Sequence, residues 1–147
     1  MSNRESLEYP NIDDFFIKQK NIYKILPIVT RKKRNTIISL SLLDWFVTNY
    51  VKKNKTFYFL NKKKFSIHEE YKAQLKDYRK KYFDPFNRSD SLLELYYNKT
   101  EFIITTFAQL NFLRWAIKSK LIKYIEDNID VINKEYKLYK DIKKSEK

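Results

Sequence analysis

The sequence predicts a single α+β domain of about five helices packed on a small, mainly antiparallel sheet. Apolar residues recur at helical spacing in several segments, and short runs of β-branched and aromatic residues separate these segments. No linker divides the chain. Its 147 residues are enough to bury roughly two-thirds of the surface that an unfolded chain of this size exposes. One domain of this length is therefore expected to fold alone.

The N-terminal part is expected to hold a flexible segment, a helix and a strand. Residues 1–11 are polar, and we place the start of the domain, which spans residues 12–128, directly after them. Asp13 and Asp14 precede an apolar-rich stretch that predicts a packing helix over residues 12–25, ended by Pro27. A dense basic run at residues 31–34 then leads into TIISL, residues 36–40, which predicts a strand.

The next segment predicts a core helix and a second strand. Ser41, with Asp44 at the capping-box position, is expected to start a helix over residues 42–52 that has a wide apolar face. Asn54 and Lys55 separate this helix from TFYFL, residues 56–60, which predicts the second strand. A basic turn at residues 61–64 follows.

The clearest pattern is a helix with two faces over residues 67–83. Ser66 and Glu69 form a capping-box pattern at its start, and Asp84 before Pro85 predicts its end. At about 100° per residue, one arc is apolar and the neighbouring arc is basic. The apolar arc holds Ile67, Tyr71, Leu75, Tyr78 and Tyr82, and the basic arc holds Lys72, Lys76, Arg79 and Lys80.

The C-terminal half predicts a β-hairpin followed by two helices. LLELYY and EFIITT flank the turn Asn98-Lys99-Thr100, as expected for paired strands. An apolar stripe then predicts a core helix over residues 106–126. Residues 129–147 are expected to form a helix, over residues 129–143, and a polar tail; this helix is exposed or docks on a partner.

The net charge of +13, with a pI of about 9.7, favours phosphate-bearing or acidic partners. From Lys52 to Lys81 there are eleven Lys and Arg residues against three carboxylates, a local charge of +8. A hydrophobic fraction of 43% is too high for a disordered basic tail, so the charge is expected to lie on a folded body. AT-rich coding offers another origin for part of the lysine excess, because Asn, Ile, Tyr and Phe are also abundant.

Several kinds of chemistry are absent from the sequence. Without cysteine there is no thiolate nucleophile or Cys-based zinc site, and without glycine there is no P-loop or Gly-rich dinucleotide loop as usually built. His68 lacks the second histidine of a zinc-binding helix motif. We expect no catalytic residue, metal site or cofactor. Because no signal-peptide run or long apolar stretch is present, we expect a soluble protein that is not secreted and does not insert into membranes.

Three stretches resemble a family of small basic proteins encoded by nucleocytoplasmic large DNA viruses. They are LLDWFVTNY (residues 42–50), YKAQLKDYRKKYFDPFNR (residues 71–88) and TFAQLNFLRWAI (residues 106–117). The resemblance covers residues 37–126. It implies a virus-encoded protein of the virion or the infected-cell cytoplasm, from viruses with large AT-rich genomes, and it assigns no catalytic residue or cofactor.

We interpret the protein as a non-enzymatic nucleic-acid-binding protein of low sequence specificity, with DNA favoured over RNA and possible association with a viral genome. Tyr78, Tyr82 and Phe83 either stack on bases or belong to the core, and for Tyr78 and Tyr82 we favour the core. The predicted phosphate contacts are Arg31, Lys32, Lys33, Arg34, Lys52, Lys53, Lys55, Lys62, Lys63, Lys64, Lys72, Lys76, Arg79, Lys80, Lys81 and Arg88.

Two alternatives remain open. In the first, the basic face of a protein-interaction or virion structural module binds an acidic viral protein. In the second, carboxylates and lysines form a metal-dependent nuclease site. The residues available for such a site are Glu70, Lys72, Asp84, Asp90, Glu94 and Lys99.

Overall fold

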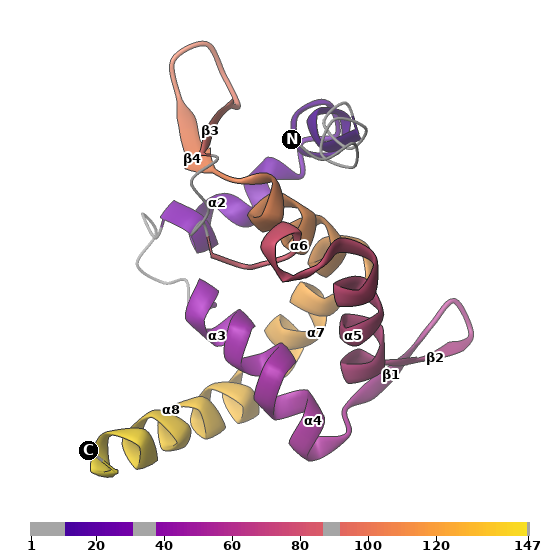
Figure 1. The fold of residues 1–147 in the computed structure, drawn as a ribbon, viewed down its shortest axis with the longest axis vertical. Helices are drawn as coiled ribbons and strands as arrows, with labels where there is room; N and C mark the ends of the chain where they lie inside the picture. The colour runs from indigo at the N-terminus through magenta and orange to yellow at the C-terminus, as the bar shows by residue number, and fades with distance from the viewer. Residues whose placement is uncertain (1–10, 31–37, 87–91, 147) are drawn as a thin grey trace.

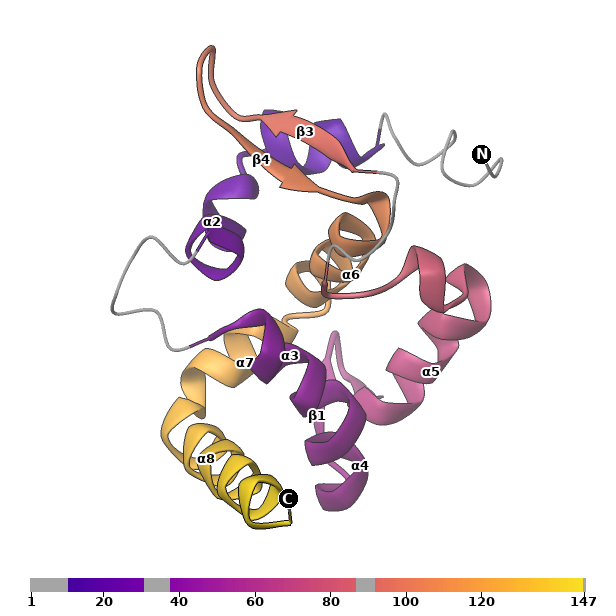
Figure 2. The ribbon, with the colours of Figure 1, turned by 60° about the vertical axis from the view of Figure 1, so that its left-hand side comes forward.

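The computed structural model describes residues 11–30, 38–86 and 92–146, and it confirms the α+β class. Within these ranges, seven α-helices and two β-hairpins form one domain around a shared hydrophobic core (Figures 1 and 2). The side chains of Phe16, Phe46, Phe83 and Phe112 are fully buried in this core. No helix among the described residues has both the length and the apolar character needed to span a bilayer.

The strands form two separate antiparallel hairpins. β1 (Phe57–Leu60) pairs with β2 (Lys63–Ser66), and β3 (Leu93–Tyr96) pairs with β4 (Phe102–Thr105). The strand predicted for residues 36–40 is not present where that segment is described, because Ile38 and Ser39 lie outside any strand and Leu40 begins a helix. Residues 36 and 37 lie outside the described residues.

The helix after this point begins two residues earlier than predicted. α3 (Leu40–Trp45), the π-helical segment η2 (Phe46–Tyr50) and α4 (Val51–Asn54) follow one another without a break and confirm the predicted core helix. Ser39, not Ser41, is the N-cap, because its Oγ accepts a hydrogen bond from the Leu42 N–H at 3.0 Å. This bond satisfies a free helix donor and fixes Ser39 as the point where the helix starts.

The N-terminal helix is also divided differently from the prediction. The π-helical segment η1 (Asp14–Lys18) and α2 (Ile22–Thr30) are separated by Lys20, which has a left-handed φ of 61°. Pro27 lies inside α2, so the predicted stop at this residue was wrong. Ile25 and Ile28 are buried on either side of it, and this packing outweighs the cost of an interior proline.

Two further helix ends were misplaced. α5 (Ile67–Tyr78) ends at Tyr78 and is followed by a 3₁₀ turn, η3 (Lys80–Tyr82), whereas the predicted helix continued to residue 83. The helix predicted over residues 106–126 is two helices, α6 (Phe107–Lys118) and α7 (Leu121–Asp127). Arg79 and Lys120 have φ values of 63° and 67°, and a helix cannot continue through that backbone region.

The last predicted helix is confirmed as α8 (Ile129–Ser145). Ile132 is buried, and the ring centroid of Trp45 lies 5.0 Å from that of Tyr136 and 5.9 Å from that of Tyr139. The first half of α8 therefore packs on the core beside α3.

Candidate nucleic-acid interface

The basic segment of the sequence folds into three consecutive elements, α4, the hairpin β1–β2 and α5, which lie next to one another (Figures 1 and 2). α5 packs against α4, η2 and β2, so the three elements form one body. We call the exposed cationic side chains of these elements, of the residues that adjoin them and of the 3₁₀ turn η3 the basic surface. Its members are Lys52, Lys53, Lys55, Lys62, Lys63, Lys64, Lys72, Lys76, Arg79 and Lys81.

α5 has the two faces that the sequence predicts. Ile67 and Tyr71 are buried against the core, whereas Lys72 and Lys76 are exposed. Ser66 occupies the N-cap position as predicted, but its side chain makes no capping hydrogen bond. The helix is therefore held by the burial of its apolar face, which leaves the lysines in solvent.

The turns that flank β1 place lysine at backbone positions where glycine is usual. Lys55 caps α4 with a φ of 51°, and Asn61 and Lys62 form the hairpin turn with φ values of 53° and 69°. The chain contains no glycine, so these residues accept a conformation that costs a side-chain-bearing residue roughly 1–2 kcal/mol. Asn tolerates this region better than most residues, and lysine does not.

Carboxylates neutralise little of the basic surface. Among its members, Lys72 alone lies within ion-pair distance of a described carboxylate, with its Nζ 3.9 Å from Oε1 of Glu69, and both side chains are well exposed. Two other members lie over aromatic rings. Lys64 Nζ is 4.4 Å from the ring centroid of Phe57, and Lys81 Nζ is 5.0 Å from that of Tyr82.

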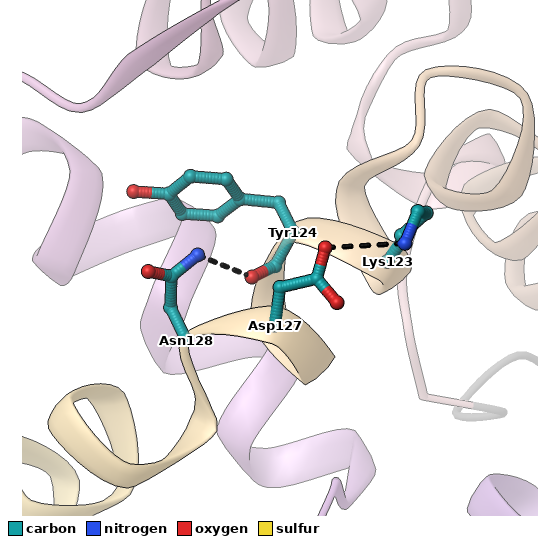
Figure 3. Close-up of polar contacts among 4 residues, drawn as sticks. All are labelled: Lys123, Tyr124, Asp127 and Asn128. Carbon is teal, nitrogen blue, oxygen red and sulfur yellow. Dashed lines mark hydrogen bonds and ion pairs between the residues drawn. The ribbon is translucent and has the colours of Figure 1, made fainter.

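A lysine outside this surface shows the opposite arrangement. In Figure 3, Lys123 on α7 points to Asp127 one turn later, and the two form an ion pair with a nitrogen–oxygen distance of 3.2 Å. The Asn128 side chain donates a hydrogen bond to the Tyr124 carbonyl at 2.9 Å and helps to end the same helix. Here the lysine serves the local structure, unlike most of the cations on α4, β1–β2 and α5.

The structure describes no side chain for six of the predicted contact residues. Five of them lie outside the described residues, and of Lys80 only the backbone is described, so the contribution of all six stays a prediction. They are Arg31, Lys32, Lys33, Arg34, Lys80 and Arg88.

The aromatic residues near the basic arc of α5 belong mainly to the core. Phe83 is fully buried, and Tyr78 stacks on it with ring centroids 5.5 Å apart. The Tyr78 hydroxyl also accepts a hydrogen bond from Arg114 Nη2 at 3.3 Å. Tyr82 is half-buried beside Lys81. This confirms the core interpretation of Tyr78.

The sequence reasoning missed two exposed rings on β1. Phe57 and Phe59 are 45% and 69% exposed, with ring centroids 6.0 Å apart, whereas Tyr58 between them faces the core. Strand alternation does place the two phenylalanines on one face. It could not identify which face is exposed, because all four residues of the strand FYFL are apolar or aromatic.

The buried tyrosines of this region have raised pKa values. Burial raises the pKa of Tyr58 to about 12, and burial together with the charges of Asp44 and Asp84 raises the pKa of Tyr71 to about 12. Both hydroxyls are therefore neutral at physiological pH. The Tyr58 hydroxyl donates a hydrogen bond to the Ser119 carbonyl at 2.6 Å, and the Tyr71 ring packs against Phe83, Phe112 and Trp115.

The residues proposed for a nuclease site are spread over three regions. Glu70 and Lys72 lie on α5, Asp84 follows η3, and Glu94 and Lys99 belong to the second hairpin. Asp90 lies outside the described residues. In the part of the chain that the structure describes, no three histidine or carboxylate side chains gather in a group able to hold a metal ion.

A polar cavity of about 500 Å³ lies between η1, α5 and α6. Its lining includes Gln74, Tyr78, Asn111, Arg114 and Lys118. The Arg114 guanidinium donates to both Tyr78 and Asn111, each at 3.3 Å. We interpret this side of α5 as a hydrogen-bonded contact between helices.

Comparisons with known proteins identify relatives but no established activity. The model of a family of unknown function, DUF7197, matches residues 3–147. An uncharacterised protein, L507 of Acanthamoeba polyphaga mimivirus, is 43% identical over 108 residues, which cover 68% of this chain and 42% of that relative. No solved structure matches. This match to a protein of a large DNA virus confirms the resemblance to viral proteins that the three sequence stretches indicate.

Proposed function

This chain belongs to DUF7197, a family of unknown function, and we propose that it is a non-enzymatic protein that binds nucleic acid with low sequence specificity through the basic surface. One observation carries the proposal. Ten exposed cationic side chains lie on α4, β1–β2, α5 and η3 or at the ends of these elements, and α5 contacts each of the other three. Among the described residues, a carboxylate pairs with one of the ten, Lys72.

Unpaired surface lysines attract a polyanion for a thermodynamic reason. A nucleic acid carries condensed counterions, and each phosphate that a lysine neutralises releases counterions into solution. This gain in entropy does not depend on base sequence. Long lysine side chains also adapt to irregular phosphate positions, because each ends in a compact charge on a flexible stem. The expected ligand class is therefore broad, with DNA of a viral genome as the proposed partner in the virion or the infected-cell cytoplasm.

The test is a salt titration of binding to random-sequence DNA. For the wild type, log affinity should fall linearly with log salt concentration. Lys63→Glu plus Lys64→Glu should weaken binding by about tenfold or more. It should also reduce the magnitude of the slope of log affinity against log salt concentration by about 1 to 2, because two phosphate contacts are lost. The matched control is Lys134→Glu plus Lys137→Glu on α8, which makes the same charge change at exposed lysines outside the basic surface.

Equal weakening by both variant pairs would indicate a general charge effect and would contradict a defined surface. Absence of salt-dependent DNA binding, with capture of one acidic viral protein that the Lys63→Glu plus Lys64→Glu variant fails to bind, would replace the proposal by the protein-interaction module. Circular dichroism of each variant shows whether the fold is retained.

A further inference from the structure

The outer face of the hairpin β1–β2 exposes two aromatic rings. Phe57 and Phe59 are two residues apart on β1, so their side chains lie on the same side of the strand. In the described structure, ring contacts with these phenylalanines come from each other, 6.0 Å apart, and from the cation of Lys64. Two large apolar side chains thus remain in solvent at one site.

The inner face of the same hairpin is firmly held. Tyr58 stacks on Phe65 and on Tyr124, with ring centroids 5.1 and 5.2 Å apart, and its hydroxyl donates a hydrogen bond to the Ser119 carbonyl at 2.6 Å. These contacts fix the orientation of the strand relative to α6 and α7. The outer face cannot turn inward without breaking them, so the exposure of the two rings follows from the fold.

A cation lies directly beside the two rings. The strand register pairs Lys64 with Phe59, so both lie on the face of the hairpin that exposes the rings. Lys63 is paired with Leu60 on the other face, and Lys62 lies in the adjoining turn. Lys64 Nζ lies 4.4 Å from the Phe57 ring centroid, so a positive charge and an aromatic surface are within one contact distance. A ligand that fits here offers a flat apolar face and an anion close together, and a nucleotide has both.

We propose that the hairpin β1–β2 binds single-stranded nucleic acid, with bases stacked on Phe57 and Phe59 and phosphates beside Lys64 and the turn residue Lys62. This proposal rests on the proposed function and narrows its ligand. The bases of a duplex are stacked on one another and do not present their faces, whereas an unpaired strand does. Stacking on aromatic side chains tolerates any base, in agreement with low sequence specificity.

A lipid surface fits the same site less well. An aromatic anchor in a bilayer enters the apolar region, and the lysine of this site sits directly over one of the two rings. Insertion of Phe57 would therefore carry the Lys64 ammonium out of water, which is costly. A nucleotide keeps that ammonium beside a phosphate.

The experiment compares a thymidine oligonucleotide with a duplex of the same length, at fixed salt. Phe57→Ala plus Phe59→Ala is expected to weaken binding of the single strand by tenfold or more, and to leave duplex binding and the salt dependence nearly unchanged, because no charge is lost. The matched control is Tyr96→Ala plus Phe102→Ala, which removes a second exposed aromatic pair, 47% and 39% exposed, from the other hairpin and should change neither affinity. Phe59→Trp supplies a second readout. The fluorescence that this substitution adds to that of Trp45 and Trp115 should be quenched by the oligonucleotide and not by the duplex.

The outcomes separate the two proposals. Equal effects of the Phe57→Ala plus Phe59→Ala variant on both ligands, or an effect on neither, would overturn the stacking site while salt-dependent binding still supports the basic surface. Binding of anionic phospholipid vesicles that depends on the two phenylalanines, without any change in oligonucleotide affinity, would also overturn it. If the wild-type protein shows no salt-dependent binding to either the oligonucleotide or the duplex, the proposed function itself is overturned. Thermal melting of each variant shows whether its fold is retained.

Discussion

The two hairpins of this molecule have similar construction and opposite surface charge. In each, one face packs on the core and the other exposes aromatic rings, Phe57 and Phe59 on β1 and the pair Tyr96 and Phe102 on β3–β4. In both views β3–β4 lies at the top of the domain, whereas β1–β2 lies lower down beside α4 and α5 (Figures 1 and 2). The first hairpin carries Lys62, Lys63 and Lys64 and no carboxylate, whereas the second carries Glu94 and Glu101 with Lys99 in its turn.

The charge difference decides which hairpin suits a polyanion. The Tyr96 hydroxyl donates a hydrogen bond to Glu94 at 3.3 Å, and the negative charge of Glu94 raises the pKa of Tyr96 above its ordinary value of 10.0. A phosphate would meet the same repulsion there. Exposed aromatic rings alone therefore do not specify a nucleic-acid site, and the neighbouring charges must be considered with them.

The largest expected effect separates the inner face of β1 from its outer face. Tyr58→Ala should lower the free energy of unfolding by about 3 kcal/mol, because it removes a packed ring and its hydrogen bond to Ser119. Phe59→Ala, at a site 69% exposed, should change it by less than about 0.5 kcal/mol. Urea denaturation measures both values. Similar losses for the two variants would mean that the outer face is also packed.

A smaller effect concerns alkaline pH. The pKa of Tyr58 is about 12 in the folded protein and 10.0 when unperturbed, so the unfolded chain releases this proton first as the pH rises. The stability that Tyr58 contributes is therefore fully present below pH 10 and is lost as the pH rises through about 12.

Tyr58→Phe should make this alkaline loss of stability shallower, and it should lower stability at neutral pH by about 1 kcal/mol through the lost hydrogen bond. In this variant the remaining loss of stability at alkaline pH should come from the buried Tyr71, whose pKa is also about 12. Urea denaturation at a series of pH values measures both effects, with Tyr71→Phe as the matched variant. An unchanged pH profile in Tyr58→Phe would contradict the assignment of this loss to Tyr58.

The smallest expected effect is a gain of binding at the second hairpin. Glu94→Lys plus Glu101→Lys places cations around Tyr96 and Phe102, and it should strengthen binding of a thymidine oligonucleotide by a few-fold, about 1 kcal/mol. Fluorescence anisotropy measures this change. A matched Glu94→Gln plus Glu101→Gln variant removes the two carboxylates without adding cations. It therefore separates the loss of repulsion between carboxylate and phosphate from the attraction between lysine and phosphate. If neither variant binds the oligonucleotide more tightly, a positive charge beside an exposed ring is not sufficient for binding. Binding at β1–β2 would then depend on a further feature of that hairpin.

The sequence predicted most elements of the fold because burial follows periodicity. The two faces of α5 and the alternation in β3–β4 are visible in the residue pattern, since each element has one apolar side. Helix ends were less predictable. Lys20, Arg79 and Lys120 end or separate helices with positive φ values, and a lysine or arginine gives no local signal of this kind because glycine and asparagine usually hold such positions.

The candidate site was only partly visible for a similar reason. Its lysines are evident from their density between Lys52 and Lys81. The exposure of Phe57 and Phe59 depends on where Tyr58 binds, and its partners Tyr124 and Ser119 lie more than sixty residues later in the chain. A contact over such a distance determines which face of an apolar strand is left in solvent, and no local pattern contains that information.

The most direct test of the account is an NMR titration of the labelled protein with a thymidine oligonucleotide, observed through backbone amide shifts. The account predicts that the largest shift changes fall between Lys52 and Lys81, centred on β1–β2, and that the amides of β3–β4 and of α8 remain unchanged. Changes centred on β3–β4 or α8, or spread evenly over the domain, would contradict it.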